Sequence, residues 1–554
     1  MTESKRGTTS AEIPSPSQPG PPGHSWLFGH LKVVGELLAS QPHMFHPHCL
    51  CQLLKEKYEI RTRYFCLDLW PVADPMLFIY DPEIAAQVTT DFQTPKYKAM
   101  ELFMSHLAGP GDMVSISGPQ WKKWRSVFNP GFAASHLMTL VPMVVDESVI
   151  FAEKMKEHAE RGSVFRMEED ATRLTVDIIG SVALDTKLNT QRGENVMVTA
   201  LRDHVHLLPN EFMNPFSMYT PTGIYKRWRN SKIMNEFIGN LLEERFSQRK
   251  AQNTDEKSST DSKKPRARAI IDLALETYLQ EEAGEADTIT TDPKPLNQPR
   301  MDETFKAQAC VHIRTFMFAG HDTTSSTICY ATYLLQKHPT ILQKLRAEHE
   351  TVLGPLLNTP ETIKNNPHIL NRLEYTLAVI KEILRLFPPA SSSRAGVPGF
   401  YVRDPESGDA VPTEGGLLWV VHHAMQRDPR IWGKDAKEFK PERFLPANAS
   451  AIPEGSWRPF EKGARNCIGQ DLALIETKII LALLARGFAF EPAFEEAVDE
   501  GGVLARDGSY FARNKRFREG SLELDGEEAF QVLIGTAKPR EGMPMRVRVA
   551  EDVF

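Results

Sequence analysis

The segment Phe460-Glu-Lys-Gly-Ala-Arg-Asn-Cys467-Ile-Gly469 decides the fold. Its single cysteine precedes a long apolar run with the pattern of a helix, so the thiol lies at a predicted helix N-terminus. Unpaired backbone N–H groups and the positive end of the helix dipole favour a thiolate there. Gly463 and Gly469 permit a tight turn and the close approach of a flat ligand, because neither carries a Cβ. Arg465 adds positive charge beside the thiolate, or pairs with a carboxylate on the ligand.

A loop of this kind can present one thiolate as the axial ligand of haem iron. The alternative is a buried structural cysteine, the usual state of Cys inside cells. The pattern Phe-x-x-Gly-x-Arg-x-Cys-x-Gly resembles the haem-binding loop of the cytochrome P-450 family, the haem-thiolate monooxygenases. The resemblance implies that Cys467 binds the iron of haem b, and that Phe460, Gly463, Arg465 and Gly469 belong to the haem-binding loop.

The bulk composition is that of a globular chain with a large core. The 554 residues are 41% hydrophobic and 25% charged, and they include 29 Phe. No repeat or clean central linker is visible, so one large domain with a minor lobe is expected. The formal net charge of −7 argues against a nucleic-acid-binding surface and suits a soluble body that faces the cytosol.

The cysteines and the N-terminal residues bear on location. Six widely scattered cysteines suggest no disulfide framework, which favours a reducing compartment. Residues 1–24 form a polar, proline-rich leader, with neither the ~18 uninterrupted apolar residues of a transmembrane helix nor a signal peptide. In the family that the chain resembles, eukaryotic members usually carry a membrane anchor before the proline-rich hinge, whereas here only the polar leader precedes it. We therefore expect a cytoplasmic protein, or one held peripherally on the cytosolic face of the endoplasmic reticulum.

Long helical patterns dominate the chain and short β-rich pieces interrupt them. Helices are predicted at Met143–Glu160, Ile233–Arg249, Phe305–Lys337, Ile341–Leu353 and Leu370–Phe387, and strands at Met76–Tyr80, Gly399–Val402 and Leu417–Val421. The predicted fold class is mainly α with a small β-rich lobe, in a single cytochrome P-450-like domain over residues 25–554. Polar insertions are expected near residues 251–266, 283–300 and 495–525, the last as a decoration of the surface.

Glu382-Ile-Leu-Arg385 ends a strongly apolar helical run. Glu382 and Arg385 share one helix face and can pair, although such a pair is most often a weak surface bridge. A buried pair needs a third partner, which Arg443 of Pro-Glu-Arg-Phe offers. Glu-x-x-Arg followed by Pro-Glu-Arg-Phe resembles the structural triad of the family. The resemblance implies that Glu382, Arg385 and Arg443 hold the core that supports the haem.

Ala319-Gly-His-Asp322-Thr323-Thr lies inside the predicted helix Phe305–Lys337. Glycine followed by hydroxyl residues weakens the helical hydrogen-bond ladder, and an ordinary polar turn in a long helix is one explanation. The segment also resembles the family's motif over the distal haem face, where the helix makes room for dioxygen. The resemblance implies that Asp322 and Thr323 deliver protons, since a hydroxyl needs a carboxylate beside it as a path to solvent.

Two further arginines resemble the family's ligands for the haem propionates. Trp121 and Arg125 lie four residues apart on one helix face, so an indole N–H and a guanidinium can reach one carboxylate. A basic surface helix is the alternative, and Lys122 and Lys123 then face an acidic redox partner. Arg394 follows the Pro-Pro break, like the family's arginine for the other propionate, although a lone loop arginine is usually solvated.

These motifs occur in an order and at a spacing similar to those of the family. The resemblance implies dioxygen activation and insertion of one oxygen atom into a lipophilic small molecule, which would lie against Phe316 and Ala319. No phosphate-cradling glycine-rich unit or flavin domain is visible, so electrons from NADPH are expected through a separate flavoprotein, the NADPH-dependent cytochrome P-450 reductase. The residues Arg-Asn-Cys-Ile-Gly-Gln of the cysteine loop resemble those of filamentous-fungal members of the family, many of which act in secondary metabolism.

Two other functions share parts of this pattern. A haem-thiolate isomerase or dehydratase has the same fold but needs no external electrons, and it commonly lacks the acid–alcohol pair Asp322-Thr323. A non-catalytic haem-binding protein needs neither NADPH nor Thr323. The monooxygenase is the function that the combined motifs favour.

Overall fold

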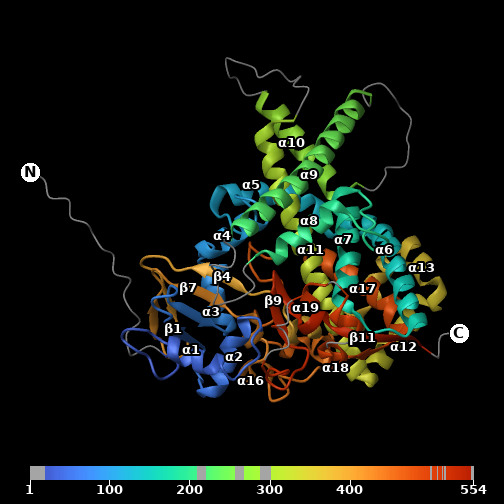
Figure 1. Ribbon diagram of the computed structural model, residues 1–554. Coiled ribbons are helices and arrows are strands. Elements are labelled where there is room, and N and C mark those ends of the chain that lie inside the picture. The colour runs from blue at the N-terminus through green and yellow to red at the C-terminus, as the bar shows by residue number, and fades with distance from the viewer. Residues whose placement is uncertain are drawn as a thin grey trace, which may run out of the picture.

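The computed structural model describes residues 19–208, 220–255, 268–286, 301–499, 502–507, 509–513, 516 and 520–550. Helices make up most of this part of the chain, and short strands gather in small sheets (Figure 1). The fold class is therefore mainly α with a β-rich lobe, as the sequence predicts.

The helices follow one another along the whole described chain, and most belong to one helical body (Figure 1). They are α1 (Leu31–Leu38), α2 (His48–Lys57), α3 (Pro82–Ala86), α4 (Lys98–Leu107), α5 (Gly118–Phe128), α6 (Ala134–Arg161), α7 (Met167–Leu184), α8 (Val196–His206), α9 (Pro221–Asp255), α10 (Ile270–Ala286), α11 (Glu303–Lys337), α12 (Pro339–Leu353), α13 (Thr359–Asn365), α14 (Glu374–Leu386), α15 (His422–Met425), α16 (Pro429–Trp432), α17 (Gln470–Gly487), α18 (Phe494–Val498) and α19 (Tyr510–Arg513).

Within the described residues, the strands form one four-stranded sheet and three smaller ones. They are β1 (Tyr64–Leu67), β2 (Met76–Ile79), β3 (Phe165–Arg166), β4 (Ser392–Ala395), β5 (Tyr401–Arg403), β6 (Ala410–Pro412), β7 (Leu417–Val420), β8 (Phe488–Pro492), β9 (Gln531–Ile534), β10 (Thr536–Pro539) and β11 (Pro544–Val549). The largest sheet has the order β1-β2-β7-β4, with β2 and β7 parallel and the other neighbours antiparallel. A second sheet has the order β3-β11-β8, and β5–β6 and β9–β10 are hairpins.

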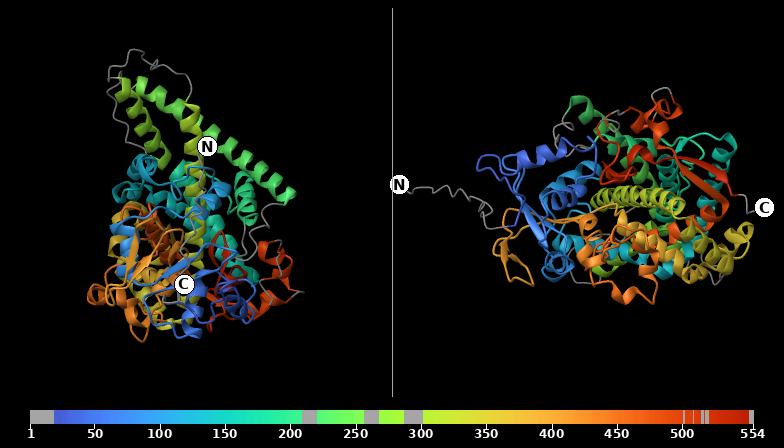
Figure 2. Two further views of the ribbon diagram at one scale, coloured as in Figure 1. Left: turned by 90° about the vertical axis from the view of Figure 1, so that its left-hand side faces the viewer. Right: turned by 90° about the horizontal axis from the view of Figure 1, so that it is seen from below.

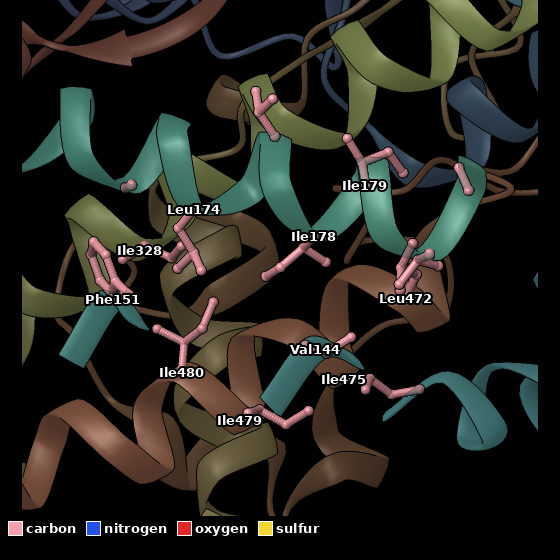
Figure 3. Close-up of a cluster of buried hydrophobic side chains, with 14 of the residues drawn as sticks. Val144, Phe151, Leu174, Ile178, Ile179, Ile328, Leu472, Ile475, Ile479 and Ile480 are labelled. Atoms are coloured by element: carbon pink, nitrogen blue, oxygen red, sulfur yellow. The ribbon is translucent and has the colours of Figure 1, made fainter. Parts of the chain in front are cut away.

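The long helix α11 runs through the middle of the molecule in both views of Figure 2. The Asp302 side chain caps its first turn by accepting a hydrogen bond from the Phe305 N–H at 2.8 Å. Most of its side chains are buried, because α7, α14 and α17 pack around it. Figure 3 shows part of this core, where Ile178 of α7, Ile328 of α11 and Ile475 of α17 are among the buried residues. The helix is thus held on several sides.

The β-rich lobe has an apolar cluster of its own, built on the four-stranded sheet. Phe65, Phe78 and Val420 are fully buried there, against residues of α1 and α2. At the top of Figure 1, α9 and α10 project from the helical body. The lobe matters for the site because its edge strand β4 carries Arg394.

Several element boundaries differ from the predicted ones for local reasons. Helix α14 begins at Glu374, because a 3-10 turn over Pro367–Arg372 precedes it. Helix α6 begins at Ala134 and contains Pro142, where the sequence suggested a start just after the proline. The predicted insertions 251–266 and 283–300 begin inside α9 and α10, and the rest of both falls outside the described residues.

The third predicted insertion, residues 495–525, is not simply a surface decoration. Leu504 and Phe511 within it are each 2% exposed. Arg166 of β3 donates hydrogen bonds to the Leu504 carbonyl at 2.9 Å and to Asp507 at 2.8 Å. Polar composition predicted exposure, but a buried arginine with hydrogen-bond partners in the segment holds part of it inside.

One described helix, α6, is long and apolar enough to cross a membrane by length and composition alone. In its apolar stretch, 44% of the residues are buried within the protein. Leu140, Val144 and Phe151 lie in the main core cluster, as Figure 3 shows for the last two. We therefore assign α6 to the helical core.

Candidate functional site

The loop that carries Cys467 folds back on itself just before α17. The Cys467 N–H donates a hydrogen bond to the Phe460 carbonyl at 2.8 Å. Glu461 has φ +58° and Gly463 has φ +79°, so the chain reverses through two left-handed residues. A Cβ on Gly463 would lie 3.2 Å from the Thr89 carbonyl, so glycine suits both the conformation and the space.

The Cys467 side chain is accessible to solvent. Enough protein nevertheless lies around the thiol that burial raises its pKa. The Gly469 N–H hydrogen-bonds to the sulfur and the positive charge of Arg125 acts on it, and both effects lower that pKa. A Cβ on Gly469 would lie 4.0 Å from the sulfur. Gly469 therefore supplies a hydrogen bond and free space beside the thiolate, at the N-cap of α17.

The loop is held in place by a carboxylate that sequence reasoning missed. Glu461 accepts hydrogen bonds from Arg458 at 2.5 Å, and its other oxygen lies 3.4 Å from His422 Nε2. Burial alone would raise the pKa of Glu461, but His422 and Arg458 lower it far below its usual value. A charged glutamate thus fixes the left-handed turn before Cys467. The signal lay in the motif itself, because Glu461 directly follows Phe460.

Arg125 and Arg465 connect the loop to α5. Arg125 donates to the Asn466 carbonyl at 2.9 Å and to the Asn466 side chain at 3.1 Å. Arg465 donates to the carbonyls of Ile116 and Val114, at 2.7 and 3.1 Å. Its guanidinium lies 4.6 Å from the centre of the Trp121 ring, so Trp121 contacts Arg465 by a cation–π interaction. The structure thereby brings Trp121, Arg125 and Arg465 to one side of Cys467.

Arg394 and Lys96 complete a cluster of four cations. Arg394 is 1% exposed, and its Nε and one Nη have no hydrogen-bond partner within the described part of the chain. Lys96 pairs with Arg394 through an isolated β-bridge. Burial, Arg394 and Arg465 lower the pKa of Lys96 to about 7, and burial, Arg394 and Arg125 lower that of Arg465 to about 10.

Arg394 is buried with unpaired donors, the other three cations are partly buried, and none of the four forms an ion pair within the described part of the chain. Two carboxylates beside the thiolate would supply anionic partners, and the haem propionates are such carboxylates. The residues present therefore fit a haem bound through Cys467. Sequence reasoning missed Lys96, because no local pattern marks a lysine at a strand bridge.

Glu382, Arg385 and Arg443 meet in the interior, and Glu382 and Arg385 are completely buried. Arg385 donates to both oxygens of Glu382 at 2.7 and 2.8 Å, and Arg443 Nε lies 3.4 Å from Glu382. The remaining donors of Arg385 reach the carbonyls of Gln426, Ala436 and Glu438. Such a satisfied network holds its neighbours in one arrangement.

Gln426 links this network to the cysteine loop. Its amide donates to the Leu384 and Arg385 carbonyls at 3.1 and 3.0 Å, and its oxygen accepts from the Arg458 N–H at 2.8 Å. Arg458 in turn holds Glu461. The buried ion pair of α14 is therefore connected, through a few hydrogen bonds, to the turn that presents Cys467.

On α11, Thr323 and Asp322 point to different neighbours. Ala319 and Thr323 are one turn apart and only partly buried, although their helix is otherwise mostly buried. The Thr323 hydroxyl donates to the Ala319 carbonyl at 2.9 Å. Asp322 is 3% exposed, and its Oδ1 lies 3.0 Å from Lys538 Nζ. The acid and the alcohol are adjacent in sequence but have separate partners.

Phe316 and Phe318 lie in different apolar clusters. Phe316 packs edge-on against Phe128 and Phe132, with ring centres 4.8 and 5.3 Å away. Phe318 instead joins a cluster from α4 and α8, whose members include Met104 and Val205. Residues 103–107 of α4 and residues 205–208 at the end of α8 thus meet at Phe318. Phe316 as a pocket wall stays a prediction, and Phe318 is the ring that sequence reasoning missed.

One buried acid on α17 also escaped the sequence analysis. Glu476 is 3% exposed, and burial raises its pKa to about 8, against a hydrogen bond with Thr324 that lowers it. Glu476 is therefore mostly protonated at neutral pH. It joins α17 to α11 one residue from Thr323.

Comparisons with known proteins agree with this geometry. The family model described as cytochrome P-450 matches residues 19–501. The cytochrome P-450 monooxygenase polC of Polytolypa hystricis is 35% identical over 541 residues, which cover 96% of this chain and 89% of that protein. The cytochrome P-450 monooxygenase acrF of Aspergillus aculeatus is 34% identical over 535 residues, covering 92% and 99%. The ptmG monooxygenase of Penicillium ochrochloron is 26% identical over 490 residues, covering 87% and 84%.

A loop cysteine at a helix N-terminus, with a cluster of cations that have no ion-pair partner in the described part of the chain, is typical of a haem-thiolate protein. The chain belongs to the cytochrome P-450 family. It is a monooxygenase that binds haem through a cysteine thiolate, receives electrons from a redox partner and acts on a small molecule. The predicted family, haem cofactor and enzyme class are thus confirmed. The alternatives of an isomerase, a dehydratase and a non-catalytic protein are not favoured by these relatives.

Proposed function

We propose that Cys467 is the axial ligand, and that its environment tunes the strength with which the sulfur binds iron. The haem, when bound, supplies dioxygen activation, which a thiolate ligand favours by pushing electron density toward O–O cleavage. The chain stabilises the thiolate through the Gly469 N–H and the charge of Arg125. Glu461 and Arg458 keep the loop in the conformation that presents the sulfur.

Arg125, Arg394, Arg465 and Lys96 would hold the two propionates, with Trp121 packed against Arg465. The unpaired nitrogens of Arg394 are the single observation that carries this assignment. Phe460, Gly463 and Gly469 shape the loop, and Glu382, Arg385 and Arg443 support it through Gln426. These last three residues act through structure and touch no reacting atom.

Asp322 and Thr323 would move protons on the distal side. Thr323 is partly exposed on the face of α11 that also bears Ala319, whereas Asp322 is turned toward a buried lysine. The hydroxyl can pass a proton to the reacting oxygen and regain one from the carboxyl group. Ala319 and Phe318 would line the substrate side, against the apolar cluster of α4 and α8.

The substrate is proposed to be a lipophilic small molecule, because the side chains that meet at Phe318 are apolar. The similarity to polC and acrF supports a role in fungal secondary metabolism. Electrons would come from NADPH through the cytochrome P-450 reductase, a flavoprotein. Exposed Lys122, Lys123 and Lys462 lie on α5 and the cysteine loop, where an acidic partner surface would meet them.

A peripheral membrane contact is the location that the surface supports best. Trp26 is 90% exposed and Trp70 is 61% exposed, with Leu27, Phe28 and Val72 exposed beside them in sequence. The two segments adjoin, because the His30 N–H donates to the Asp68 carbonyl at 2.7 Å. Exposed tryptophans suit a membrane interface. Co-flotation with phospholipid vesicles tests this, and protein that stays in the aqueous fraction would contradict it.

The central test is the spectrum of the reduced carbon monoxide complex. Wild-type protein should show the Soret band typical of thiolate ligation and should oxidise NADPH when the reductase is added. Cys467→Ser should lose that band and at least about a hundredfold of the turnover, since the sulfur donates to iron. Cys310→Ser, at a buried cysteine of α11, is the matched control and should keep both. A Cys467→Ser variant with an intact band would overturn the assignment.

A further inference from the structure

A buried group of charges lies behind Asp322, on the side of α11 that faces the C-terminal hairpin β9–β10 (Figure 1). Lys538 of β10 is 2% exposed. Its Nζ lies 2.6 Å from Glu168 Oε1, 2.8 Å from Ser325 Oγ and 3.0 Å from Asp322 Oδ1. One ammonium thus joins the first turn of α7 to α11.

The group combines one ammonium, that of Lys538, with two carboxyl groups, those of Asp322 and Glu168. Burial alone would lower the pKa of Lys538, but the two carboxylates raise it above its ordinary value, so the lysine stays charged. Burial likewise opposes ionisation of Glu168, and Lys538 lowers its pKa. Two carboxyl groups therefore share one ammonium in a buried site.

Asp322 uses only one of its two carboxyl oxygens in this group. Its Oδ2 is buried and has no hydrogen-bond partner in the part of the chain that the structure describes. The hairpin turn covers this oxygen, because a Cβ on Gly535 would lie 3.2 Å from it. Gly535 also has φ +73°, so both the backbone conformation and the lack of space for a Cβ favour glycine in this turn. The hairpin and Lys538 together fix the direction of the Asp322 carboxylate.

Glu169 lines two spaces, a small cavity beside this group and a hollow at the surface. A cavity of about 30 Å³ is lined by Asp322, Lys538, Glu168, Glu169 and His206, among others. That volume holds a water molecule with polar partners on several sides. Glu169 also lines a surface hollow of about 490 Å³ on the outer side of α7. Glu169 is therefore in contact with both spaces.

The properties of Glu169 suit the transfer of protons between these spaces. Its side chain is 25% exposed and its Oε2 lies 3.4 Å from Arg202. Burial and the neighbouring Glu168 raise its pKa to about 7, against Arg202, which lowers it. A carboxyl group with a pKa near the working pH both gains and loses a proton readily.

We propose that Glu169 and Glu168 form a proton relay that reloads Asp322 from the α7 surface, with Lys538 as the residue that positions Asp322. The proposal rests on the proposed role of Asp322 and Thr323. Each turnover consumes one dioxygen, two electrons from the redox partner and two protons, and yields one hydroxylated product and one water. Both protons enter at Glu169, pass through the cavity to Asp322, and leave from Asp322 to Thr323, so the relay residues are unchanged at the end.

The test compares two oxidants that give the same product. Thioanisole is the probe, and its sulfoxide is measured. With NADPH, reductase and dioxygen, sulfoxide formation needs protons from outside. With cumene hydroperoxide, one oxygen atom is transferred and the alcohol leaves, so no external proton or electron is needed. The ratio of the two rates therefore reports proton delivery and is insensitive to a loss of holoenzyme.

Glu169→Gln and Lys538→Met should lower the NADPH-driven rate by about tenfold or more, with hydroperoxide-driven rates within about twofold of wild type. The NADPH-driven rate should also show a larger solvent isotope effect in D₂O. Lys55→Met is the matched control, because Lys55 is a second buried lysine, 2.8 Å from Asp428 in the β-rich lobe. It should leave the ratio of the two rates unchanged.

Each other outcome has a defined meaning. Glu169 is partly exposed, so its variant should fold even where Lys538→Met does not. A ratio unchanged in Glu169→Gln, whether both rates fall or neither does, overturns the relay. A wild-type enzyme that forms sulfoxide with the hydroperoxide but not with NADPH overturns the proposed function, and the relay with it.

Discussion

We propose that the cysteine loop and the Asp322 turn of α11 serve the two faces of the same site, and they are positioned in different ways. Cys467 depends on neighbours close in sequence, namely Phe460, Glu461 and Gly469. Asp322 depends on Lys538, which lies far away in the sequence. Lys538 also bonds to Ser325, and these two residues are 213 positions apart. The proximal side is a local motif that a distant network supports. The distal side combines a local motif with a charge brought from the C-terminus.

The two kinds of support differ in which amino-acid substitutions they tolerate. A local motif tolerates changes elsewhere as long as its supports stay satisfied. A charge contributed by a remote hairpin is lost when that hairpin moves, even though the helix that carries Asp322 is intact. The following predictions test this contrast, from the largest effect to the smallest.

Breaking the network under the cysteine loop should have the largest effect. Arg385→Leu leaves Glu382 buried without its partner, which costs about 3–5 kcal/mol of stability. The variant should unfold at lower denaturant concentration and retain little haem. Lys440→Ala removes an ion pair with Asp435 whose lysine is 52% exposed, and it should cost less than about 1 kcal/mol. Equal stability of the two variants would show that the buried triad does not support the loop.

On the distal side, Thr323→Ala should separate NADPH use from product formation. Without the hydroxyl, the share of NADPH electrons recovered in sulfoxide should fall by about tenfold, because one step of proton transfer is missing. Thr327→Ala is the matched control one turn later, where the hydroxyl donates to the Thr323 carbonyl at 3.0 Å. Unchanged recovery in Thr323→Ala would contradict the assignment of this hydroxyl.

Lys96 predicts a pH dependence of haem binding. Its pKa is about 7 in the protein without haem, and ionised propionates favour the protonated ammonium. Binding therefore takes up a proton above pH 7, and the haem affinity should fall by up to about tenfold for each further pH unit. Lys96→Met should remove this dependence, whereas Lys462→Met, at an exposed position, should retain it. A wild-type affinity that is flat from pH 7 to 9 would exclude Lys96 as a propionate ligand.

The smallest effect is expected at the surface of α5. Replacing Lys122 and Lys123 together by Glu should raise the reductase concentration needed for half-maximal turnover by roughly fivefold at low salt. Added salt should reduce the difference, since it screens surface charges. Lys156→Glu, at an exposed position of α6, serves as the charge control. If the double variant behaves like this control, the reductase binds at a surface other than α5.

The sequence predicted the residues that belong to compact motifs with fixed spacing. Cys467, Glu382, Arg385 and Asp322 are of this kind. Lys538, Glu168 and Lys96 could not be found in the same way, because a lysine or a glutamate without a local pattern is usually solvated. Their roles depend on which strands and helices meet in space, and that information is spread over the chain.

The face of a helix that a side chain occupies is also hard to predict from sequence alone. Phe316 and Phe318 are two positions apart, which on a helix turns the side chain by about 200°. Phe316 therefore packs against Phe128, while Phe318 reaches the cluster of α4 and α8. Burial of Leu504 and Phe511 was missed for a similar reason, since the polar composition around them predicts a solvated segment.

The hairpin β9–β10 has a practical consequence for protein engineering. Chimaeras that exchange the C-terminal third between related enzymes would give α11 a foreign counter-ion for its acid. Crossover points are safer where Glu168, Asp322 and Lys538 all come from the same parent. Tags or fusions at the C-terminal end should likewise be joined through a spacer, so that the strand carrying this lysine keeps its register against α11.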